Sequence, residues 1–234
     1  MNGEHGRALF TEETLQIPFG TKQLCAVLCS PSVPPVEATA GLLLTHGAGG
    51  DMNFTQLVSL AHAVAANGFL CLRFTCKGLN LVYRGKAYRA VWDYFQSSFP
   101  TIKHIFLGGR SMGCRAAACL LRQLSDGSEE AAQCLICLSF PLHPPSRTDA
   151  HLQRSLDLRE LPPDTSVLFV SGTRDDMCDP DLLKETVQNM KAQAEVLWLD
   201  GGSHGLAVKG RSEDSVMEEV NSFVTMWMSK QITS

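Results

Sequence analysis

The feature that most constrains the fold is a regular alternation between short apolar runs and longer segments with helical spacing. The apolar runs predict strands at residues 42–45, 69–74, 104–107, 134–140, 167–171 and 196–199. Apolar residues at intervals of three and four predict helices at residues 55–66, 87–95, 112–124, 181–190 and 215–228. Strands that alternate with helices in this way form βαβ units and a parallel sheet. Because the strands are almost continuously apolar, we expect helices on both faces of the sheet.

The start of the sequence departs from this alternation. Residues 14–19 and 23–29 predict two strands with only a short connection between them. Such a connection joins antiparallel strands, which indicates a hairpin at one edge of the sheet. Residues 32–37 are rich in proline and predict a loop, not a domain linker. We therefore expect a single α/β domain over residues 1–234, with a mostly parallel sheet of about eight strands, an antiparallel edge hairpin and helices on both faces.

Composition and charge exclude several classes of protein. Hydrophobic residues make up 44% of the sequence and charged residues 19%, which is not the composition of a disordered chain. The net charge of −4 argues against a general nucleic-acid binder. Residues 1–14 lack the apolar stretch of a secretory signal, and no segment approaches the roughly 18 apolar residues of a membrane-spanning helix. We expect a cytoplasmic or nuclear protein with no nucleic-acid partner and no membrane span.

The nine cysteines are an odd number in a chain without a signal, and we expect them to be reduced thiols. Cys134 and Cys137 form a C-x-x-C pair, for which a redox pair or half of a zinc site are alternatives. A buried strand fits the apolar surroundings better, and residues three apart on a strand point to opposite faces. The sequence contains no second C-x-x-C that would complete four ligands, so we expect no metal site.

Residues 109–113, Gly-Arg-Ser-Met-Gly, match the pattern G-x-S-x-G. An apolar strand precedes the motif and an alanine-rich helix follows it. In that context a serine on the sharp strand-to-helix turn presents its hydroxyl at the carboxyl end of the sheet. Ser111 is therefore the candidate nucleophile. The alternative is an incidental serine in an ordinary turn between a strand and a helix.

A serine hydroxyl needs a base to take its proton, and the base needs a third group to orient it. Asp175 and His204 each follow a predicted strand, so both should lie at the carboxyl edge of the sheet. With Ser111 they stand in the chain order Ser, Asp, His that α/β-hydrolases use. His204 as a purely structural residue is the alternative for the base. For the acid we prefer Asp175, with its neighbours Asp176 and Asp179 as alternatives.

A glycine-rich loop, His-Gly-Ala-Gly-Gly at residues 46–50, follows the predicted strand at residues 42–45. Glycine lets backbone N–H groups approach an oxyanion that develops on the substrate. We expect the N–H groups of Ala48 and Met112 to be the two donors of this oxyanion hole, and His46 to hold the loop. A phosphate-binding loop is the alternative, but neither of its glycine-rich motifs is present.

These motifs together resemble the α/β-hydrolases, in particular the small dienelactone-hydrolase-like branch. The matching segments are spread over the chain at residues 46–50, 72–78, 109–113, 172–175 and 203–205. The resemblance implies a serine hydrolase without a cofactor, acting on a small-molecule acyl substrate such as an ester, a thioester or a peptide-like compound. The branch also includes a chromatin-complex subunit, so a non-catalytic interaction or scaffold protein with a protein partner is the alternative.

The substrate side of the site is less constrained by the sequence. Residues 73–89 carry five basic side chains and no acid. Lys77 among them could attract an anionic substrate, although a solvated basic loop is the preferred interpretation. Arg110, beside the serine, is expected to pair with a buried acid. Residues 141–165 follow a predicted strand where this fold inserts a lid, and they predict a partial one.

Overall fold

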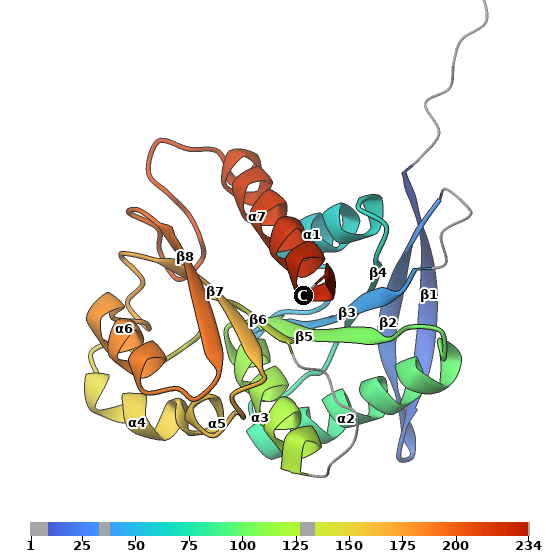
Figure 1. Ribbon diagram of the computed structural model, residues 1–234, viewed down its shortest axis with the longest axis horizontal. Coiled ribbons are helices and arrows are strands. Elements are labelled where there is room, and N and C mark those ends of the chain that lie inside the picture. Colours follow the sequence, from blue (N-terminus) through green and yellow to red (C-terminus); the bar gives the residue numbers. More distant parts are fainter. Residues whose placement is uncertain (1–8, 33–37, 127–133, 234) are drawn as a thin grey trace, which may run out of the picture.

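An eight-stranded sheet forms the centre of the protein (Figure 1). The computed structural model describes residues 9–32, 38–126 and 134–233, so most of the predicted loop at residues 32–37 and the first part of the N-terminal segment lie outside the described residues. In space the strands follow the order β1-β2-β4-β3-β5-β6-β7-β8. Their bounds are β1 (Phe10–Phe19), β2 (Lys22–Pro31), β3 (Ala40–Thr45), β4 (Leu70–Phe74), β5 (His104–Arg110), β6 (Cys134–Leu138), β7 (Ser166–Gly172) and β8 (Gln193–Leu199).

The directions of the strands confirm the predicted sheet. From β4 through β3 and β5 to β8, neighbouring strands run parallel. The strands β1 and β2 form an antiparallel hairpin, and β2 pairs antiparallel with β4. The carboxyl ends of the parallel strands therefore share one edge of the sheet, where α/β proteins bind their ligands.

Helices cover both faces of the sheet, as the apolar strands predict (Figure 1). Helices α1 and α7 pack on one face, and α2, α3, α5 and α6 contribute buried residues to the other. The helices are α1 (Thr55–Ala66), α2 (Leu81–Ser98), α3 (Met112–Asp126), α4 (His151–Arg154), α5 (Leu156–Arg159), α6 (Pro180–Gln188) and α7 (Glu213–Thr233), with a 3-10 turn at Thr148–Ala150.

The central strand β3 shows why the strands are apolar throughout. Leu42 and Leu44 pack in the core beneath α1 and α7, whereas Leu43 packs in the core beneath α2 and α3. Successive side chains of a strand point to opposite faces, so a strand covered on both faces buries every residue. The two cores fix the strand ends that carry the candidate site.

Helix α2 begins at Leu81, six residues before the predicted start at residue 87. Asn80 caps it, because its side-chain oxygen accepts a hydrogen bond from the Tyr83 N–H at 2.9 Å. The predicted start lay too far along the chain because charged residues interrupt the apolar stripe in the first turns of the helix. One of them, Arg84, is buried all the same. The short helices α4 and α5 were not predicted, since four residues are too few to show helical periodicity.

The C-x-x-C segment forms strand β6, as predicted. Cys137 lies in the core beneath α2 and α3, and Cys134 packs against the core beneath α1 and α7. The two thiols therefore lie on opposite faces of the sheet, which excludes a bond between them and a shared metal. All nine cysteines are free.

Candidate active site

The candidate nucleophile lies on a strained turn between β5 and α3. Ser111 has a φ of +51°, a left-handed conformation that is uncommon for residues other than glycine. Its backbone N–H donates to the Leu138 carbonyl oxygen at 2.9 Å, which ties the turn to β6. A Cβ atom on Gly113 would lie 2.8 Å from the His46 carbonyl oxygen, so this position must be glycine. Gly113 therefore lets the turn pack against the end of β3.

The structure brings Ser111, His204 and Asp175 together at the carboxyl edge of the sheet. Ser111 Oγ lies 2.8 Å from His204 Nε2. On the other side of the ring, His204 Nδ1 lies 2.9 Å from Oδ2 and 3.0 Å from Oδ1 of Asp175. An aspartate acts only as an acceptor when ionised, so Nδ1 carries the proton and Nε2 is free to accept one from the serine.

The geometry separates Asp175 from its two neighbours. The Asp175 side chain is fully buried, and one of its oxygens also accepts the Met177 N–H at 2.8 Å. Asp176 is exposed. Asp179 caps α6 by accepting the N–H groups of Asp181 and Leu182. Of these three aspartates, only Asp175 lies within hydrogen-bond distance of the His204 ring.

The glycine-rich loop lies against the serine. A Cβ atom on Gly47 would be 3.1 Å from Ser111 Cβ, so the loop approaches the serine as closely as a glycine allows. Within the described part of the chain, neither the Ala48 N–H nor the Met112 N–H donates a hydrogen bond to a protein group. His46 is 1% exposed; its Nδ1 bonds the Gly47 carbonyl oxygen within the loop, and its Nε2 accepts the N–H of Cys76, which follows β4. Among the described residues, the N–H groups of Ala48 and Met112 thus have no protein acceptor, which leaves them available to a ligand.

Among the described residues, Arg110 forms no ion pair with a buried acid, so that prediction was wrong. Its Nη2 donates to the His204 carbonyl oxygen at 3.3 Å, and its guanidinium stacks on the Phe54 ring with the central carbon 4.7 Å from the centroid. Burial lowers the pKa of the guanidinium, while the nearby Cys114 and Asp175 offset part of that effect. Arg110 therefore supports the backbone beside His204.

The predicted solvated basic loop is also corrected. Arg73 and Arg84 are 3% and 1% exposed, whereas Lys77 is exposed. Arg84 donates to carbonyl oxygens of the glycine-rich loop, so it belongs to the site although the sequence analysis did not single it out. No sequence signal separates Arg84 from a solvated arginine, because its acceptors are backbone carbonyls. Whether Lys77 attracts an anion stays a prediction.

A cluster that could hold a metal ion lies away from this site, on the edge hairpin. Glu12, Cys29 and His62 bring ligand atoms within 4.8 Å of one another. Arg73 already binds two of them, since its Nη1 lies 2.7 Å from Glu12 Oε1 and 2.9 Å from Cys29 Sγ. Burial is the main reason that the pKa of the Cys29 thiol rises to about 12, and metals bind the thiolate. The donor set therefore fits an ion-pair network better than a metal.

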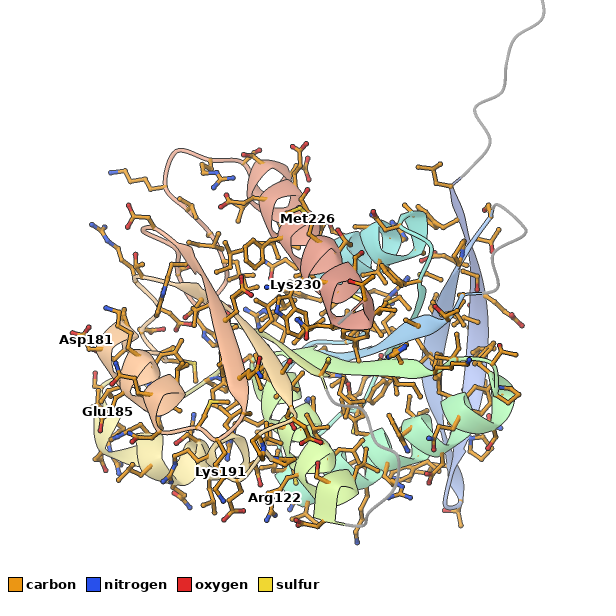
Figure 2. The ribbon with its side chains drawn as sticks, in the orientation of Figure 1. Arg122, Asp181, Glu185, Lys191, Met226 and Lys230 are labelled. Carbon is orange, nitrogen blue, oxygen red and sulfur yellow. The ribbon has the colours of Figure 1, made fainter. Side chains whose placement is uncertain are left out.

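The segment predicted as a partial lid contains the 3-10 turn, α4 and α5. Arg122, which Figure 2 labels, lies on α3 and forms ion pairs with Asp157 and Glu160 at 2.9 and 2.8 Å. Arg122 stands ten residues beyond the start of α3, so these contacts attach α5 to the far end of that helix. The role of residues 141–165 as a partial lid stays a prediction.

Residues 38–231 match the family described as the alpha/beta hydrolase domain. The match spans most of the chain, and the chain therefore belongs to the α/β-hydrolase family. Among the described residues, none of the helices combines the length and apolarity needed to cross a membrane.

Several solved structures are similar to this one. Est1E from Butyrivibrio proteoclasticus has a TM-score of 0.76 and 18% identity, over 94% of this chain and 99% of that chain. A dienelactone hydrolase from Anabaena variabilis has a TM-score of 0.74 and 13% identity, over 95% and 98%. XC6422 from Xanthomonas campestris, described as a serine hydrolase without a lid, has a TM-score of 0.66 and 18% identity, over 92% and 94%. At these identities the likeness shows a shared fold.

Proposed function

We propose that this protein is a serine hydrolase that cleaves small acyl compounds through a covalent acyl-enzyme on Ser111. The observation that carries the proposal is the continuous hydrogen-bonded chain from Ser111 Oγ through the His204 ring to the Asp175 carboxylate. A nucleophile, a base and an orienting acid within hydrogen-bond reach are the arrangement that activates a serine hydroxyl.

In the first half of the proposed reaction, Ser111 Oγ attacks the acyl carbonyl carbon while His204 Nε2 takes the hydroxyl proton. The N–H groups of Ala48 and Met112 stabilise the oxyanion of the tetrahedral intermediate. His204 then returns the proton to the leaving group, and the acyl-enzyme remains. In the second half, His204 takes a proton from a water molecule that attacks the acyl carbonyl carbon, the bond to Ser111 Oγ breaks, and His204 returns the proton to Ser111 as the acid leaves. Asp175 holds the ring in the required tautomer and stabilises its charged form throughout.

We propose esters as the first substrate class, with thioesters and peptide-like compounds as the further classes that this chemistry allows. Two structural neighbours, Est1E and the dienelactone hydrolase, support this choice, and one structure of Est1E holds ferulic acid. The same neighbours support the finer placement in the dienelactone-hydrolase-like branch. The proposed reaction needs no cofactor. Nine free thiols persist in a reducing compartment, which supports a cytoplasmic or nuclear location.

The test is labelling by a fluorophosphonate probe together with hydrolysis of p-nitrophenyl esters. Wild type should label and turn over, and Ser111→Ala should do neither. Ser139→Ala is a matched control, because Ser139 also has a positive φ after a strand and is fully buried, yet its hydroxyl has no hydrogen-bond partner among the described residues. Folded wild type that neither labels nor hydrolyses esters would favour the alternative of a non-catalytic interaction protein.

A further inference from the structure

Arg84 is a buried cation whose hydrogen-bond acceptors are all backbone carbonyls. The residue is 1% exposed. Its Nη1 donates to the His46 oxygen at 2.7 Å, its Nη2 to the Gly47 oxygen at 3.1 Å and its Nε to the Gly78 oxygen at 2.7 Å. Within the described residues no carboxylate pairs with it, and burial lowers the pKa of its guanidinium. A charge is costly to bury, and the three carbonyl oxygens are the groups that offset this cost for Arg84.

The Gly47 carbonyl is held from two directions. Besides Arg84, His46 Nδ1 lies 2.7 Å from the same oxygen. His46 Nε2 accepts the Cys76 N–H at 3.0 Å, so Nδ1 must carry the ring proton and donate it to Gly47. Burial, with a smaller contribution from the Arg84 charge, lowers the pKa of His46 and favours this neutral ring. Arg84 and His46 therefore form a carbonyl clamp on Gly47.

The clamp also fixes the next N–H along the chain. The Gly47 carbonyl and the Ala48 N–H belong to one peptide unit, which is planar and trans, so the two bonds point in opposite directions. An oxygen held toward Arg84 and His46 turns the Ala48 N–H away from them. The loop at this point touches Ser111, since a Cβ atom on Gly47 would be 3.1 Å from Ser111 Cβ. Hydrogen bonds to a carbonyl also polarise the N–H of the same peptide and strengthen it as a donor.

We propose that Arg84 is a positioning residue for the oxyanion hole: together with His46 it clamps the Gly47 carbonyl and aims the Ala48 N–H at the oxyanion. This inference rests on the proposed function, because the donor matters only if an oxyanion forms. Arg84 acts through Ala48 and touches neither the substrate nor Ser111. Interactions that strengthen only in the transition state raise kcat and leave KM almost unchanged.

The test compares Arg84→Met and Arg84→Lys with wild type on a p-nitrophenyl ester, with the concentration of active sites titrated by a fluorophosphonate. Arg84→Met should lower kcat per active site by about 10²-fold, the size of loss expected from a small misplacement, while KM changes less than about threefold. Arg84→Lys keeps the charge but loses the planar fork of the guanidinium, so its kcat should lie between those of wild type and Arg84→Met.

The affinity of each variant for an alkylboronic acid, which forms a tetrahedral adduct on the serine, should fall in step with its kcat. Lys86→Met, at an exposed position on the same helix, is the control and should change neither constant.

The outcomes separate this inference from the proposed function. If wild type itself neither labels nor turns over, the proposed function fails, and the inference that rests on it fails with it. If wild type is active and kcat per labelled site in Arg84→Met equals that of wild type, Arg84 is only structural and the inference is overturned. Should Arg84→Met not fold, Arg84→Lys decides in the same way: a tenfold or larger loss of kcat at constant KM supports the clamp, and no loss overturns it.

Discussion

The backbones of Gly172 and Gly202 are in direct contact, and this contact joins the loop that carries Asp175 to the loop that carries His204. A Cβ atom on Gly172 would overlap the Gly202 carbonyl group, and one on Gly202 would lie 3.0 Å from Gly172 Cα. The Arg174 N–H also donates to the Gly202 oxygen at 2.8 Å. The hydrogen bond between His204 and Asp175 therefore depends on two glycines that lie outside the triad.

Gly172→Ala should push these two loops apart. Adding a methyl group to a closely packed site costs about 1–3 kcal/mol of unfolding free energy, and a displaced acid should lower turnover by about 10²-fold. Urea unfolding and ester hydrolysis measure the two effects. Gly205→Ala is the matched control in the same loop, because its Cβ would meet Ser203 Oγ at an ordinary 3.7 Å. Equal behaviour of the two variants would show that the glycine contact does not matter.

The choice of acid can be tested with two adjacent residues. Asp175→Asn should lower kcat by about 10⁴-fold, since an amide in place of the carboxylate favours the wrong tautomer of the imidazole. Asp176→Asn should stay within about twofold of wild type, because Asp176 is exposed and Asp175 fills the place beside the ring. Steady-state kinetics on one ester are sufficient. A larger loss in Asp176→Asn than in Asp175→Asn would reverse the assignment.

The backbone at Ser111 should show a conflict between stability and activity. A residue other than glycine held at a φ of +51° costs about 1 kcal/mol or more, and glycine is free of this cost. The free energy of unfolding of Ser111→Gly, measured with urea, should therefore exceed that of Ser111→Ala by about 1 kcal/mol. Both variants should be inactive. If Ser111→Gly proves less stable than Ser111→Ala, the turn does not store strain.

The sequence predicted the fold well because the fold follows from periodicity. The apolar strands and the helices between them occur in the predicted order, although α2 begins six residues early, and the short hairpin connection predicted the antiparallel edge. The residues Ser111, Asp175 and His204 could be proposed because each follows a strand whose carboxyl end reaches the same edge of the sheet. The preference for Asp175 over Asp176 depends on which side chain turns inward, and only the structure shows that.

Contacts between distant parts of the chain explain what the sequence did not predict. Arg73 pairs with Glu12, 61 residues away, and Arg84 binds carbonyls 37 and 38 residues away. Backbone carbonyls leave no trace in a sequence, so a buried arginine that binds them resembles a surface charge. The short helices α4 and α5 escaped for another reason, since each has too few residues to show a period, and α5 is attached to α3 by an ion pair between residues far apart in the sequence.

The pH dependence of stability should reveal the Glu12 network on the edge hairpin. Burial alone would raise the pKa of the Glu12 carboxyl, but hydrogen bonds from Arg73, His62 and Cys29 outweigh it and lower the pKa to about 2. A carboxyl whose pKa is lower in the folded state stabilises the protein above its unfolded pKa of 4.5, and the contribution is lost as pH falls toward 2. Because the Glu12 side chain is 39% exposed, solvent screening reduces the contribution to about 1 kcal/mol.

Glu12→Gln should therefore be less stable than wild type by about that amount at pH 7, and the unfolding free energies of the two proteins, measured with urea, should converge between pH 4.5 and pH 2. Glu13→Gln, one residue along β1, is the control; a gap of constant size in Glu12→Gln across this range would mean that the carboxyl titrates alike in the folded and unfolded chains.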